Sequence, residues 1–205
     1  GAGVQVLIAG PASTRIGALN PGPGEYQWFA GGGGGSSAPG FSQPQPAPSI
    51  MQGGVGRGGS GDSTKTTSSA GGTSTGGGGG ATCTDLGENG GSGIVVVRYQ
   101  IGSVQTAKAT GGSISFAGGK TIHTFLASAP FNAPAQITGA EMLIVAGGGG
   151  GGNYLGGGGG GGEVLHLTNY TISAADHTVQ VGGGGGGGAR NAVNGVKGNF
   201  SYFST

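Results

Sequence analysis

Five uninterrupted runs of glycine constrain this chain more than any other feature of its sequence. Thirty of its 57 glycines lie in these runs, which are Gly31–Gly35, Gly76–Gly80, Gly147–Gly152, Gly156–Gly162 and Gly182–Gly188. Collagen is excluded because it needs glycine at every third position with other residues between. Flexible linkers usually mix glycine with serine and separate whole domains. Only Asn153-Tyr154-Leu155 separates the third run from the fourth, so a linker there would join no domains.

Besides flexible linkers, the runs fit polyglycine II, an extended left-handed helix like polyproline II. Its rise of about 3.1 Å per residue makes seven glycines span about 22 Å. Such a helix has no internal hydrogen bonds, so buried N–H and C=O groups need partners in neighbouring segments. Ordering thirty glycines costs on the order of 30–60 kcal/mol, whereas a hydrogen bond contributes a net gain of about 1 kcal/mol. We therefore expect a hydrophobic scaffold to clamp the ends of the runs.

Short strand-like segments flank the glycine runs and supply such a scaffold. Several of them alternate apolar and polar residues, as in Thr178–Val181, and no segment has a helical period. The stretches 10–24, 39–48 and 58–75 are predicted to be loops from their proline, glycine, serine and threonine content. Nine strands are predicted: Val4–Ala9, Tyr26–Ala30, Ile94–Ile101, Ser113–Phe116, Thr121–Leu126, Glu141–Ala146, Glu163–Leu167, Thr178–Val181 and Asn199–Ser204. The pattern favours an all-β fold, an antiparallel sandwich of jelly-roll type with one modest core.

Charge and composition exclude several classes of function. Eight Lys and Arg residues balance seven Asp and Glu residues, which argues against an electrostatic nucleic-acid binder. No apolar run approaches the roughly 18–20 residues that span a bilayer. Cys83 is the only cysteine, so an internal disulfide is impossible. His123 and His166 fall in apolar strands and His177 at a turn that enters a strand, so ordinary sheet positions are favoured over metal ligands. We expect no enzyme, no cofactor and no metal.

Several motifs resemble those of a known family. The opening Thr110-Gly111-Gly112-Ser113-Ile114 is followed by Gly118–Phe125, then by strands that end in glycine runs, and Gly90–Tyr99 carries the closing motif Gly-Gly-Ser-Gly-Ile-Val-Val-Val-Arg-Tyr. This series resembles the glycine-rich repeat domains of phage tail-fibre and viral surface proteins. It is also similar to the glycine-rich module in the extracellular part of the anaplastic lymphoma kinase receptor. The resemblance implies a TNF-like β-sandwich that carries packed polyglycine II helices.

The motifs occur in an unusual order, because the closing motif precedes the opening one. We therefore interpret residues 1–100 as the C-terminal half of a glycine-rich sandwich domain and residues 101–112 as a connector. Residues 113–205 are then the N-terminal half of the next, or permuted, domain. One period of a tandem array, a subunit that donates half a sandwich to its neighbour, and a circular permutation within a monomer all fit this order.

Together these features predict a non-enzymatic extracellular structural protein, the repeating unit of a fibre or filament. The alternative is a receptor-binding adhesin, such as a phage tail-fibre tip that recognises a host surface glycan or protein. Its partners would be copies of itself or that host surface, with no nucleic acid and no membrane insertion, and its location would be extracellular or on a virion or cell surface. The candidate contact residues are aromatic: Tyr26, Trp28, Phe41 and Tyr154. Strand alternation favours Trp28 as a core residue instead.

Overall fold

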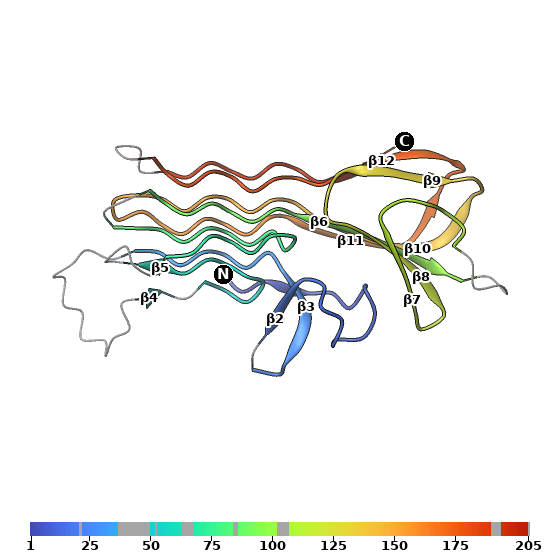
Figure 1. Cartoon of the computed structure of the whole chain (residues 1–205), viewed down its shortest axis with the longest axis horizontal. Helices are drawn as coiled ribbons and strands as arrows, with labels where there is room; N and C mark the ends of the chain where they lie inside the picture. Colours follow the sequence, from blue (N-terminus) through green and yellow to red (C-terminus); the bar gives the residue numbers. More distant parts are fainter. Residues whose placement is uncertain are drawn as a thin grey trace.

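The computed structural model describes residues 1–20, 22–36, 50–51, 53–62, 68–83, 86–101, 107–189 and 194–204. These residues form antiparallel β-strands and extended glycine segments, and none of them lies in a helix, which confirms the all-β prediction. Accordingly, no described helix is long and apolar enough to cross a membrane. In Figure 1 the larger sheets occupy one end of an elongated molecule, and the glycine segments run side by side to the other end.

A five-stranded antiparallel sheet forms the centre of the β end, in the order β11-β10-β6-β8-β7. A three-stranded sheet, β13-β12-β9, forms a second layer, and one hydrophobic cluster contains buried residues of both sheets, including Val97, Phe125, Phe131 and Val179. The arrangement is sandwich-like. The strands of the two sheets are β6 (Ile94–Gln100), β7 (Ser113–Ala117), β8 (Lys120–Phe125), β9 (Ala129–Ala133), β10 (Ile137–Val145), β11 (Val164–Ile172), β12 (Ala175–Gln180) and β13 (Tyr202–Ser204).

The N-terminal residues cover the opposite face of the five-stranded sheet. A small sheet there has the order β1-β3-β2, with β1 at Val4–Gln5, β2 at Ala18–Asn20 and β3 at Glu25–Phe29. Ile8 and Phe29 pack in a second cluster against alternate residues of β6 and β10, among them Val96 and Leu143. The continuous apolar run Ile94–Val97 is explained by this double coverage, because both of its faces are buried. A two-stranded pair, β4 (Ile50–Met51) and β5 (Gly61–Asp62), lies among the glycine segments.

Strand β6 joins the two predicted halves of the sequence in one sheet. It comes from residues 1–100, yet it pairs with β8 on one side and with β10 on the other, both from residues 113–205. The central sheet is therefore completed within a single chain, which is the arrangement that a circular permutation requires. The domain boundaries themselves stay a prediction.

Most predicted strands are present, with corrections at particular segments. Strand β9 was not predicted, because Ala129-Pro130 has little strand propensity, but β9 is an edge strand, where proline is tolerated. Strand β2 lies inside the predicted loop 10–24, and β1 ends at Gln5 instead of Ala9. In β3 the fully buried aromatic residue is Phe29, whereas Trp28 is only half-buried, so the expectation of Trp28 as the core residue is wrong.

Candidate functional site

The glycine segments continue directly from the strands, so the hydrophobic layers fix one end of each. We call these segments rods and name them by their residues; β3 leads into the 31–36 rod, β10 into the 147–152 rod and β12 into the 182–188 rod, while the 156–162 rod leads into β11. Three further rods, 76–82, 87–93 and 194–200, contain other residues besides glycine. The rods lie nearly parallel in Figure 1, and together they form the glycine bundle.

Hydrogen bonds within the bundle repeat every three residues. In the 76–82 rod, Gly78 and Ala81 donate to the carbonyl oxygens of Gly31 and Gly34, at 2.8 and 2.9 Å. The next residues along, Gly79 and Thr82, donate instead to the 147–152 rod, at 2.9 and 3.2 Å. Each rod thus bonds to different neighbours at successive residues and returns to the same neighbour at the third. This differs from a β-ladder, in which a strand bonds only to the strands on its two sides.

Backbone packing explains why most rod positions are glycine. At Gly150 a Cβ atom would lie closer than 3.0 Å to backbone atoms of Gly186 and Gly187, and at Gly78 closer than 3.0 Å to those of Gly159 and Gly160. Real Cβ atoms essentially never show such distances. At these positions the rods contact one another through backbone groups, at a spacing that leaves no room for a side chain.

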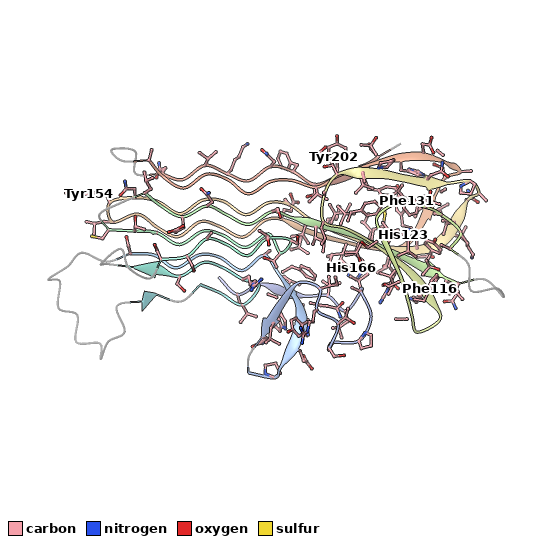
Figure 2. The ribbon with its side chains drawn as sticks, in the orientation of Figure 1. Phe116, His123, Phe131, Tyr154, His166 and Tyr202 are labelled. Atoms are coloured by element: carbon pink, nitrogen blue, oxygen red, sulfur yellow. The ribbon has the colours of Figure 1, made fainter. Side chains whose placement is uncertain are left out.

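A short loop closes the bundle at the end away from the sheets. Asn153, Tyr154 and Leu155 connect the 147–152 and 156–162 rods, and the N–H of Gly152 donates to the carbonyl of Gly157 across the loop, at 2.8 Å. The Asn153 side chain is buried and donates to the Ala189 carbonyl at 3.2 Å. Figure 2 places Tyr154 at this end of the molecule, far from the labelled residues of the β end.

Two residues of this loop are exposed and strained. Tyr154 is 71 % exposed and Leu155 is 51 % exposed, with φ angles of 50° and 67°. Left-handed backbone costs of order 1–3 kcal/mol at each non-glycine residue and persists only where the surroundings enforce it. A third apolar residue, Leu86, is 54 % exposed, and its carbonyl accepts a bond from the Thr82 hydroxyl, which anchors it to the same end of the bundle. We call Tyr154, Leu155 and Leu86 the tip.

An ion cluster ties the N-terminal layer to the central sheet. Glu141 on β10 accepts hydrogen bonds from Arg98 at 2.6 Å and from Lys120 at 2.7 Å. Arg98 also donates to the carbonyl oxygens of Leu7 and Ile8, at 2.7 and 3.3 Å. Burial would raise the pKa of Glu141, but the hydrogen bonds and charges of Arg98 and Lys120 lower it to about 2. The cluster clamps two layers together, and its carboxylate is held in the ionised form by two cations.

Two of the histidines also hold buried positions in the sheets. His123 is fully buried, its Nδ1 lies 2.7 Å from the Gly111 carbonyl, and its Nε2 lies 2.8 Å from the Tyr99 hydroxyl. Burial lowers the pKa of His123, only partly offset by the bond to Gly111, so the neutral ring is favoured. His177 is buried within β12 and stacks on Phe203, which corrects its predicted place at a turn. Within the described residues no group of three or more His, Cys, Asp or Glu could hold a metal ion.

The four predicted contact residues do not come together. Tyr26 and Trp28 are half-buried on β3, beside the central sheet, whereas Tyr154 lies at the tip. Phe41 lies outside the described residues. Sequence reasoning missed Leu155 and Leu86 as exposed residues. A usable signal was present for Leu155, because an apolar residue in a short loop between two glycine runs belongs to no strand and is therefore expected to be exposed at the end of a rod.

Comparison with known proteins finds a similarity to a protein family over part of the chain. Residues 124–205 match the family described as "Glycine-rich domain". The matched segment contains β9 to β13 and the 147–152, 156–162 and 182–188 rods. No curated protein and no solved structure matches the chain. These residues, less than half of the chain, are therefore similar to a glycine-rich domain, and the function must be argued from the geometry.

Proposed function

We propose that this protein is a non-enzymatic extracellular adhesin, in which the glycine bundle is a stiff stalk that presents the tip to a host surface glycan or protein. The observation that carries the proposal is the exposed, strained pair Tyr154 and Leu155 at the end of the bundle. Strained backbone clusters at ligand-binding sites, where the strain is part of preorganisation. A tyrosine supplies a large, rigid surface that stacks on sugar rings or apolar patches at low entropic cost.

The rods are suited to such a role. We infer that they are polyglycine II helices, because their hydrogen bonds repeat every three residues, the repeat of that helix. The sandwich that clamps them would then be of the TNF-like, jelly-roll type that the resemblance implies. A bundle bonded on several sides along its length resists bending, and a rigid support reduces the conformational entropy that the tip loses on binding.

Replacing the tip residues is expected to abolish surface binding without unfolding the protein. The double variant Tyr154→Ala, Leu155→Gly removes the exposed side chains and relieves left-handed strain at Leu155. We expect at least a tenfold loss of binding, since a buried interface tyrosine contributes about 2 kcal/mol or more. Binding is measured to an array of immobilised microbial and animal surface glycans and to intact bacterial cells.

Tyr170→Ala is the matched control, since Tyr170 is also exposed but lies on β11 in the sandwich. It should bind as the wild type does. An equal loss of binding in both variants, or binding unchanged by the tip variant, would place recognition elsewhere. A wild-type protein that bound neither the array nor the cells would contradict the adhesin proposal.

A fibre-forming role is a second candidate, favoured by the edges of the central sheet. β7 and β11 are its outer strands and have no further partner among the described strands. Ile114 and Phe116 on β7 are 40 % and 48 % exposed, and Leu165 on β11 is 45 % exposed. Exposed apolar edge strands add strands from other chains. This role predicts that the purified chain forms filaments visible by negative-stain electron microscopy, and that Ile114→Lys removes them, because edge lysines block strand addition.

A further inference from the structure

The N–H and C=O groups of the 147–152 rod point in six directions around its axis, and five of these directions are occupied by a neighbouring rod. Its N–H groups point to three rods, in pairs three residues apart: Gly147 and Gly150 donate to the 194–200 rod, Gly148 and Gly151 to the 87–93 rod, and Gly149 and Gly152 to the 156–162 rod. Its C=O groups accept from two more: those of Gly148 and Gly151 from the 182–188 rod, and those of Gly149 and Gly152 from the 76–82 rod. Donor and acceptor neighbours therefore alternate around this rod.

The third pair of carbonyl groups, those of Gly147 and Gly150, lacks a hydrogen-bond donor among the described residues. Within the described part of the chain, no N–H donates to the carbonyl oxygen of Gly147 or of Gly150, although both residues are buried. They are three residues apart, as in the two pairs that are occupied. Buried backbone carbonyls in folded proteins are nearly always paired. One acceptor position beside this rod is thus open.

The open position is a groove of about 670 Å³ between the 156–162 and 194–200 rods. At the occupied positions, the rod that donates to one carbonyl also packs on the Cα of the preceding residue: the 182–188 rod donates to Gly151 and packs on Gly150. By the same rule the partner of the Gly150 carbonyl would pack on Gly149. A Cβ at Gly149 would meet nothing closer than 3.5 Å, and Gly149 lines the groove. Divided by a rod length of about 22 Å, this volume gives a cross-sectional area of about 30 Å², enough for one extended chain.

The 156–162 rod forms one wall of the groove and consists only of glycine, although packing within this chain does not require glycine at all of its positions. A Cβ at Gly157 or Gly160 would meet no atom within 4 Å. The opposite wall shows what an outer rod tolerates, because the 194–200 rod carries Val196 and Lys197 and keeps glycine only where Gly195 and Gly198 face the interior. The N–H groups of Gly157 and Gly160 also have no acceptor among the described residues, and their three-residue spacing matches that of the open carbonyls.

We propose that the groove binds the 156–162 rod of a second copy of this chain, whose N–H groups would donate to the Gly147 and Gly150 carbonyl oxygens. A second copy is the occupant because its outer rod has the two properties that the groove demands: no side chain on its open face, and donors three residues apart. The bundle would thus continue from one protomer into the next. This association is independent of the tip and so goes beyond the proposed adhesin role.

The experiment is a measurement of molar mass by light scattering and sedimentation equilibrium over a wide range of protein concentrations. The wild type is expected at twice the mass of one chain. Gly149→Val fills the groove floor, and Gly160→Val blocks the outer rod. Each should weaken association about tenfold or more, because a side chain between two packed backbones is severe overpacking. The control is Gly186→Val, since a Cβ at Gly186 also meets nothing within 4 Å but Gly186 does not line the groove.

A monomeric wild type at every concentration would overturn the proposal. So would a dimer that all three variants retain, or one that Gly186→Val disrupts as strongly as Gly149→Val. Mass that rises only in the presence of an added extended peptide, with the protein alone monomeric, would assign the groove to a different partner and likewise overturn it. Far-ultraviolet circular dichroism of each variant establishes that a change in mass does not come from unfolding.

Discussion

Replacing Gly150 by alanine is expected to destabilise the protein by about 3 kcal/mol or more, the upper range for overpacking a core. Gly150 lies in the 147–152 rod, and its Cβ would fall closer than 3.0 Å to the backbone of Gly186 and Gly187. A flexible side chain can move aside, but here the obstacle is the main chain of a neighbouring rod. Relief would require separating the two rods, and that would break the bond from Gly185 to Gly148 and the bond from Gly188 to Gly151.

Gly186→Ala is the matched control, because Gly186 belongs to the obstructing rod but has open space where its Cβ would go. Neither position has a positive φ, so neither substitution strains the backbone. Alanine at the open position reduces the entropy of the unfolded chain, and we expect a stabilisation of about 0.4–1 kcal/mol. Urea unfolding followed by circular dichroism gives both free energies of unfolding. Equal effects of the two substitutions would show that the bundle is loose at Gly150 and that glycine there is not required by packing.

The glycine runs and their flanking strands could be predicted because both signals are local. A pure glycine run is unmistakable, and the alternation in segments such as Thr178–Val181 marks a half-buried strand. The prediction that strands clamp the runs is confirmed for the 147–152 rod, which follows β10, and for the 182–188 rod, which follows β12. Which face of β3 is buried was harder to predict, because Trp28 and Phe29 are adjacent aromatic residues. Only the layer that packs on β3 decides which of the two side chains is buried.

Rods that contain side chains were not predicted, since they lack a glycine run. In the outer 194–200 rod only Gly195 and Gly198, three residues apart, meet backbone within 3.0 Å, whereas in the 87–93 rod Gly91 and Gly93 do so as well as Gly87 and Gly90. Glycine at every third position is therefore enough for an outer rod, and this spacing can be read from sequence. The position of Tyr154 in a loop between two glycine runs could be predicted from the sequence. Its exposure could not, because it depends on which rods end next to this loop in the folded bundle.

Replacing Glu141 by glutamine is expected to cost about 3 kcal/mol of folding free energy at neutral pH, the equivalent of lowering the pKa of this carboxyl from 4.5 to about 2. The Glu141 side chain is 17 % exposed, and those of Arg98 and Lys120 are 21 % and 33 % exposed, so solvent screens the cluster only in part. Glutamine keeps the shape but leaves two cations without a counter-charge, and breaking a buried ion pair in this way is strongly destabilising. Trp28, the only tryptophan, lies in the N-terminal layer that Arg98 holds, so its fluorescence reports the unfolding of that layer.

The stability difference between the wild type and Glu141→Gln should decrease at acidic pH. Because folding lowers the pKa of Glu141, its contribution to stability is fully present above pH 4.5 and is lost as the pH falls towards 2. The change in this difference between pH 4.5 and 2, measured between the wild type and Glu141→Gln, isolates this group, since titrating residues that do not contact Glu141, such as His123, contribute equally to both proteins. Glu163→Gln is the control, because Glu163 is exposed and has no ion pair within the described residues. A difference that persisted unchanged at pH 2, or one as large for Glu163→Gln, would show that the charge of Glu141 does not hold the two layers together.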